Sequence, residues 1–294
     1  MSAHTNSIPW PPYRVRARNI SRDAGPSVHS DQVARSLGFK GALVAGRVIY
    51  SHLLHPLVSH FGVDFLARNR AQVTFLKPAY EGDPLTVLTE SASSPGAERV
   101  CTACARNGEQ AEVARLETSL PLPFPAPNAL AATALHDLAA QAPAPFDGVR
   151  RKGSWEALQP GLALAAFPWT PSKEHNLSWC DEIGEALPLF REGEAPPLHP
   201  GLLPTATTEL LHQQLAIRGW VHVSSLFLHH ALLRAGQKLE LRATPLEKWE
   251  RKGRHFVKLY VAVVEIDAGD GAGDGAENAR VLAEEFRTAI IKGE

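Results

Sequence analysis

Residues Val28–Gly46, VHSDQVARSLGFKGALVAG, lead directly into the apolar run RVIYSHLLHPLVSHFGVDFL, Arg47–Leu66. Wound as a helix, this second run would be apolar on nearly every side. Such a helix must be covered on several sides by the rest of its domain. An antiparallel sheet that curves around one helix gives this cover. The sequence therefore predicts a helix that begins near Gly46, at the centre of such a sheet.

Strand-like runs with alternating apolar residues follow this helix. After Val73–Gly82, Leu85 and Val87 alternate as in a strand, and the runs Val100–Arg106 and Gln110–Leu120 follow. The second half repeats the order, because Gly201 precedes the apolar run LLPTATTELLHQQLAI and further runs follow at Phe227–Gly236, His255–Asp267 and Ala279–Lys292. Gly46 and Gly82 stand 36 positions apart, and Gly201 and Gly236 stand 35 apart. The shared order predicts two copies of one unit, packed sheet to sheet as a pseudo-dimer.

Proline-rich segments separate the two units. Pro121–Asn128 (PLPFPAPN) and Gln141–Gly148 (QAPAPFDG) favour extended connections, because proline fixes φ and lacks a backbone donor. We therefore expect an N-terminal unit over residues 1–120, a linker over 121–150 and a C-terminal unit over 151–294. Another segment, Ala268–Asn278 (AGDGAGDGAEN), has no side chain that could build a core and predicts a hairpin connection.

The composition is that of an ordinary globular protein, with 44% apolar and 21% charged residues. A net charge of −1 gives no indication of a nucleic-acid or membrane surface. Three cysteines suit a reducing compartment better than a disulfide scaffold. We expect no signal peptide, because the N-terminal residues lack a charged segment followed by an apolar one. We expect a cytoplasmic protein, and a homodimer of the tandem unit because exposed sheet edges are usually covered.

The runs Val28–Gly46 and Ala71–Leu85 resemble the MaoC-like acyl-CoA dehydratase and (R)-specific enoyl-CoA hydratase group. The first resembles that family's Val-His pair, acidic residue, short helix and "GF.GGLV.G" turn. The second resembles its "RF..PVY.GD.L" strand and turn. The resemblance covers roughly residues 13–90. It implies an α+β fold of two tandem hotdog domains, each an antiparallel sheet wrapped around a central helix, with the catalytic groups in the first.

The resemblance also implies site residues. His29 matches the family's histidine, which works with an aspartate five residues before it in a G-D-x-N-P-[ILV]-H pattern. Ala24 stands at that position here, and Asp23 lies one step further away. An inserted residue in the loop would still let Asp23 serve as the second catalytic group. Gly46, at the start of the central helix, is expected to help bind the thioester oxygen.

The resemblance implies reversible hydration of a 2-enoyl-CoA, or dehydration of a 3-hydroxyacyl-CoA. A carboxylate and an imidazole that hold one water can carry both proton transfers near neutral pH. No metal or redox cofactor is implied, and the partner is an acyl-CoA or acyl carrier protein thioester. Two alternatives remain open. One is a hotdog acyl-CoA thioesterase, and the other is a non-catalytic acyl-thioester-binding protein.

Three further groups have simpler explanations. Asp31 is expected to stabilise the first turn of a short helix that begins at Ser30. His52 and His55 are helical neighbours without an evident third metal ligand. The basic cluster in WERKGRHF, Arg251, Lys252 and Arg254, could meet CoA phosphates or form a solvated hairpin tip.

Overall fold

The computed structural model describes residues 8–21, 27–93, 99–120, 135, 143–217, 219–266 and 280–292. Most of the predicted linker (121–150) and the whole of the predicted hairpin connection at Ala268–Asn278 lie outside these residues. No helix among the described residues combines the length and the apolar character needed to cross a lipid bilayer.

In the described part of the first half, residues 8–120, two strands come first, three helices follow and four strands complete it. Its helices are α1 (Asp31–Ser36), α2 (Gly46–Phe61) and α3 (Val63–Ala67). Its strands are β1 (Ile8–Pro9), β2 (Tyr13–Arg16), β3 (Asn69–Phe75), β4 (Pro84–Ser93), β5 (Arg99–Arg106) and β6 (Glu112–Leu120).

The second half, residues 143–292, has the same core order. Its helices are α5 (Lys173–Ile183), the 3₁₀ turn η1 (Pro188–Phe190) and α6 (Leu202–Gln214). Its strands are β7 (Arg151–Lys152), β8 (Phe167–Trp169), β9 (Leu215–Ala216), β10 (Gly219–His229), β11 (Leu239–Arg251), β12 (Arg254–Glu265) and β13 (Arg280–Lys292).

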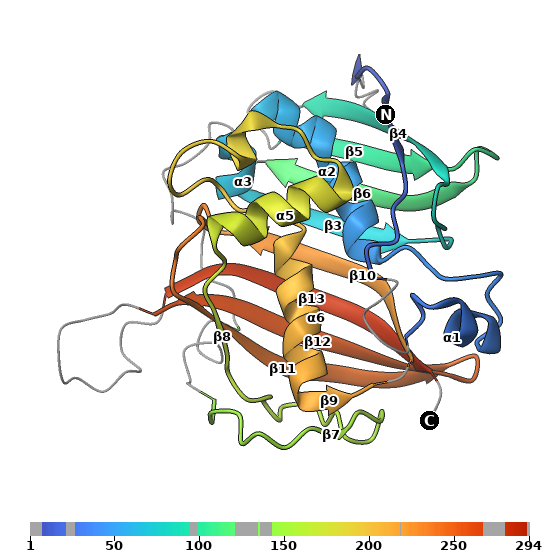
Figure 1. Ribbon diagram of the computed structural model, residues 1–294, viewed down its shortest axis with the longest axis vertical. Helices are drawn as coiled ribbons and strands as arrows, with labels where there is room; N and C mark the ends of the chain where they lie inside the picture. The colour runs from blue at the N-terminus through green and yellow to red at the C-terminus, as the bar shows by residue number, and fades with distance from the viewer. Residues whose placement is uncertain are drawn as a thin grey trace, which may run out of the picture.

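Within the described residues, eleven strands form one antiparallel sheet that runs through both halves (Figure 1). The strand order is β1-β4-β5-β6-β3-β10-β13-β12-β11-β8, with β2 paired to β4. β3 and β10 are neighbours at the middle of this sheet. Outward from them, the order β3-β6-β5-β4 in the first half corresponds to β10-β13-β12-β11 in the second half. The sequence predicts two sheets packed against each other, but the structure joins them edge to edge into one sheet, where β3 pairs with β10 from Thr74–Ser224 to Asn69–His229.

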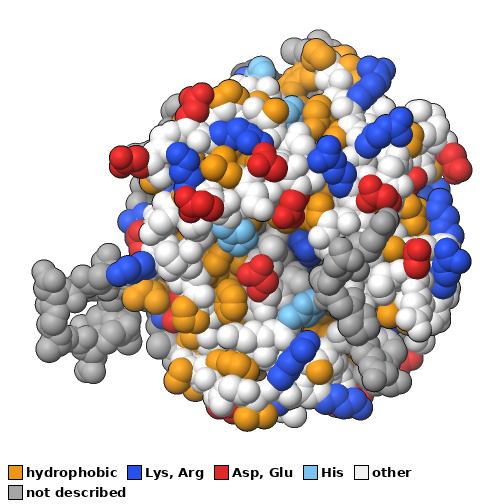
Figure 2. Space-filling model, in the orientation of Figure 1, with side chains coloured by type: hydrophobic (Ala, Val, Ile, Leu, Met, Phe, Trp, Pro, Cys, Tyr) orange, Lys and Arg blue, Asp and Glu red, His pale blue; other side chains and the backbone are white. Residues whose placement is uncertain are grey.

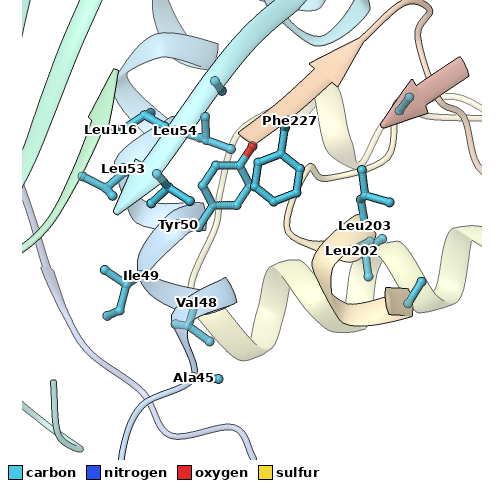
Figure 3. Packing of buried hydrophobic residues seen from close by; sticks show 14 of the residues in the cluster. Ala45, Val48, Ile49, Tyr50, Leu53, Leu54, Leu116, Leu202, Leu203 and Phe227 are labelled. Carbon is cyan, nitrogen blue, oxygen red and sulfur yellow. The ribbon is translucent and has the colours of Figure 1, made fainter. Parts of the chain in front are cut away.

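Each half wraps its sheet around one central helix, as the sequence predicts. α2 contacts β4, β5 and β6, and α6 lies along the strands of the second half (Figure 1). The two helices also contact each other. Tyr50 of α2 stacks on Phe227 of β10 with ring centroids 4.6 Å apart (Figure 3). Apolar side chains of both halves therefore form one shared core.

The start of α6 is packed too closely for any side chain at Gly201. A Cβ atom placed there would lie 2.3 Å from Oγ of Ser51 on α2 and 2.7 Å from the ring of Trp179 on α5. Glycine is required here because three elements meet at one point of the backbone. At Gly46, by contrast, the three atoms nearest to such a Cβ would be at the far edge of the Phe75 ring, at 3.0–3.2 Å.

Gly201→Ala is expected to lower the free energy of unfolding by about 1–3 kcal/mol, because α6 must move away from α2 and α5. Gly46→Ala is the matched control and should cost less, since the Phe75 ring can turn. Urea unfolding followed by circular dichroism measures both variants. Equal losses would show that the contact with Ser51 and Trp179 does not limit the packing.

Candidate active site

His29 lies in the segment that joins β2 to α2, and its backbone is fixed on two sides. The side-chain amide of Asn19, which is buried, donates to the His29 carbonyl at 2.9 Å. The backbone nitrogen of Leu43 donates to the carbonyl of the preceding residue, Val28, at 3.0 Å. These bonds hold the histidine beside the strand-like turn that enters α2.

The ring of His29 is held in one tautomer. Its Nδ1 lies 2.8 Å from the Leu43 carbonyl oxygen, which can only accept, so Nδ1 donates its proton. In the neutral ring Nε2 is then the basic atom. Burial lowers the pKa of His29 to about 4, with Arg47 and His212 acting in the same direction, while the Leu43 bond opposes them. His29 is therefore a neutral base at pH 7.

A cavity of about 550 Å³ opens beside His29. The first half contributes the start of α2 and the turn after β3, and the second half contributes α6, β10 and the end of β13. This volume lies within the usual range of small-molecule sites. The cavity is built from both halves, so it depends on the junction between them.

The cavity is strongly cationic. The basic residues on its wall are Arg47, Lys77, Arg254, Arg287 and Lys292, and Glu209 is the one carboxylate among its described lining residues. The surface in Figure 2, by contrast, shows acidic and basic side chains interspersed. Arg287 is neutralised by Glu285, whose Oε1 lies 2.7 Å from its Nε. The remaining positive charge makes the cavity suited to an anionic ligand.

The first turn of α2 supplies hydrogen-bond donors to the cavity wall. Ala45, Gly46 and Arg47 all line it. The first N–H groups of a helix have no partner within the helix, and they lie at the positive end of its dipole. This arrangement can stabilise negative charge that develops on a carbonyl oxygen.

The corresponding place in the second half is closed. A space of only about 10 Å³ remains beside the start of α6, bordered by His199, Leu203 and His229. Trp179 of α5 donates from its indole nitrogen to Nδ1 of His199 at 3.0 Å, so buried side chains fill the position. Burial lowers the pKa of His199 to about 3.

The structure brings His29 and Gly46 to the same cavity, while Asp23 lies outside the described residues. Arg254 also reaches the cavity wall, next to a hairpin turn at Lys252, where φ is 51°. Asp31 begins α1 as expected, but its carboxylate accepts from the backbone of Ala42 at 2.7 Å, across the turn.

Of the two α2 histidines considered as metal ligands, His55 has other partners. His55 bonds through Nδ1 to Glu185 at 2.8 Å and stacks on Tyr13 at 4.0 Å. His52 is buried beside them, and burial lowers its pKa to about 4. Among the described residues, no group of three histidine, cysteine or acidic side chains is placed to hold a metal.

Sequence reasoning missed Arg47 and His212. Arg47 had a visible signal, since it places a cation at the helix end that disfavours one. His212 had none, because it reaches the cavity only through the packing of α6 against the first half. Burial and the charges of Arg150, Arg47 and Arg287 lower the pKa of His212.

Known structures with the same fold span nearly the whole chain. A Chloroflexus aurantiacus protein named as a dehydratase with a MaoC domain superposes with a TM-score of 0.66 and 14% identity over 98% of this chain and 96% of that one. A MaoC-like dehydratase gives 0.59 and 13% over 99% and 98%. A conserved hypothetical protein of Mycobacterium tuberculosis, described as having a double hotdog fold, gives 0.55 and 16% over 98% and 96%.

The fold is a double hotdog. The predicted α+β class and the two wrapped helices are thus confirmed. No family model matches the sequence, and no curated protein matches it. At these identities the double-hotdog likeness establishes architecture, and the chemistry must be argued from the cavity.

His29 is expected to titrate with a midpoint near pH 4 in the folded protein, instead of near 6.5. The unfolded chain then binds more protons than the folded one between these values, so stability should fall as pH drops from 6.5 towards 4. A nuclear magnetic resonance titration follows the imidazole signals of wild type, and the signal that is missing from His29→Gln belongs to His29. Urea unfolding at pH 7 and pH 5 should show a shallower pH dependence for His29→Gln. A midpoint near 6.5 would contradict the burial of a neutral ring.

Proposed function

We propose that this double-hotdog protein reversibly hydrates a 2-enoyl thioester, or dehydrates the 3-hydroxyacyl thioester, with His29 as its base. The observation that carries the proposal is the Nδ1 bond from His29 to Leu43, which makes Nε2 the basic atom at the edge of a 550 Å³ cavity. The fold shared with MaoC-like dehydratases is consistent with this chemistry but does not establish it.

In the proposed reaction, Nε2 of His29 takes a proton from water while the hydroxyl oxygen bonds to C3 of the enoyl group. The C2–C3 π electrons move towards the thioester oxygen and form an enolate. N–H groups at the start of α2, around Gly46, stabilise that negative charge. The enolate then collapses as C2 takes the proton held by the His29 imidazolium, directly or through a second acid–base group, so His29 is neutral again and the sum is addition of one water.

A second acid–base group would separate the two proton transfers. We propose Asp23 for that role, following the family's carboxylate. His212 is a second candidate, because it lines the same cavity and its charge acts on His29.

The substrate carrier in this proposal is CoA, since Lys77, Arg254 and Lys292 offer cations for its phosphates. We also propose that the tandem unit is cytoplasmic and forms a homodimer.

His29→Ala is expected to lower the hydration rate about 10²–10⁴-fold, the usual effect of losing an acid–base group. The assay offers 2-enoyl-CoAs of different length and branching and follows loss of the conjugated absorbance, with a thiol reagent present. Release of free CoA thiol would favour the thioesterase alternative instead. Binding of acyl-CoA without any turnover in wild type would favour the non-catalytic alternative.

Asp23→Asn tests the second group. If Asp23 shares the water with His29, this variant should lose activity about as strongly as His29→Ala, and the double variant should be scarcely worse than either, because the pair acts as a unit. His212→Gln is the matched comparison from the second half. Full activity in Asp23→Asn with loss in His212→Gln would transfer the role to His212.

A further inference from the structure

Arg47 occupies a position that is unfavourable for a cation. It is the second residue of α2, and the first turn of that helix contains no acidic residue. A helix N-terminus carries partial positive charge, so a cation there is destabilising. The guanidinium is also largely withdrawn from solvent, with Nε fully buried. Both effects raise the cost of keeping Arg47 charged.

The protein offers Arg47 little compensation. One bond runs from its Nη2 to Oγ of Ser21, at 2.7 Å, and the guanidinium carbon lies over the Trp179 ring, 6.0 Å from the ring centroid. Within the described residues, its Nε has no hydrogen-bond partner and no carboxylate lies at ion-pair distance. Burial, and then Arg287, lower the pKa of Arg47 to about 10, while Glu209 and Glu182 oppose this. Arg47 therefore stays protonated at neutral pH and has no ion-paired carboxylate in the part of the chain that the structure describes, which does not include Asp23.

The place of Arg47 indicates which part of a ligand it meets. It follows Gly46 in the chain, and both line the cavity with His29. In the proposed function the thioester lies at this helix start, so Arg47 lies beside the acyl group. The CoA phosphates are many bonds away along the pantetheine arm, and other cations are available for them. The thioester oxygen itself is uncharged in the bound substrate.

We propose that the substrate's acyl group is short and carries a second carboxylate, which Arg47 binds. This inference rests on the proposed function, because it takes the thioester to lie at the start of α2. A carboxylate supplies the missing negative charge and matches the planar fork of a guanidinium. A plain alkyl chain would leave the buried cation with no partner among the described residues except the Ser21 hydroxyl and the Trp179 ring.

The test uses glutaryl-CoA and pentanoyl-CoA, which have the same chain length and differ in the terminal carboxylate. Calorimetry at pH 7.5 should show that wild type binds glutaryl-CoA about 10–100-fold more tightly, the range of a charge-assisted hydrogen bond. Arg47→Met should remove this preference and leave pentanoyl-CoA affinity nearly unchanged. Lys77→Met is the matched control, and it should weaken both ligands by the same factor.

Equal binding of the two ligands by wild type would overturn the inference without any variant. An unchanged preference in Arg47→Met, or equal weakening of both ligands, would also overturn it. Neither probe has a double bond or a 3-hydroxyl group, so binding is measured independently of hydration. Loss of the hydration activity with a retained Arg47-dependent preference would overturn only the proposed function. Hydration of uncharged enoyl-CoAs without any carboxylate preference would overturn only this inference.

Discussion

The pairing of β3 with β10 is the interaction on which the rest of the molecule depends. Each half has a sheet edge there, and an unpaired edge exposes a row of backbone donors and acceptors. Joining the two edges satisfies these groups and makes one sheet of both halves. It also brings α2 and α6 into contact, so that Tyr50 can stack on Phe227. The cavity beside His29 exists because two halves are held in this relation.

The two ends of this junction are packed differently. Near the start of α2, side chains do not fill the space, and a cavity remains between the first turn of α2 and the side of α6. Near the start of α6 the space is filled by α5, whose Trp179 approaches Gly201 and bonds to His199. Filling one end adds buried apolar contact, which stabilises the fold. The open end carries the cost of a poorly compensated cation and a desolvated histidine, which suits a binding site.

Much of the fold could be predicted from the sequence. The apolar runs after Gly46 and Gly201 predict the two central helices, and alternation predicts β5, β6, β12 and β13. Helix α5 was not predicted, because its sequence KEHNLSWCDEI is mainly polar and has no counterpart of similar length in the first half. The edge-to-edge pairing gave no local signal either, because it depends on register between strands about 150 residues apart, such as Thr74 opposite Ser224.

The site residues also differ in whether they could be predicted from the sequence. His29 and Gly46 could be found because they lie in one continuous segment whose local pattern resembles a known family. His212 and Arg287 could not, because they reach the cavity only when α6 and β13 pack beside α2. Arg47 lies between these cases. Its sequence neighbours show that it opposes the helix dipole, but only the packed structure shows that no carboxylate compensates it among the described residues. A charge that is unfavourable both locally and after folding is best explained by a ligand that binds it.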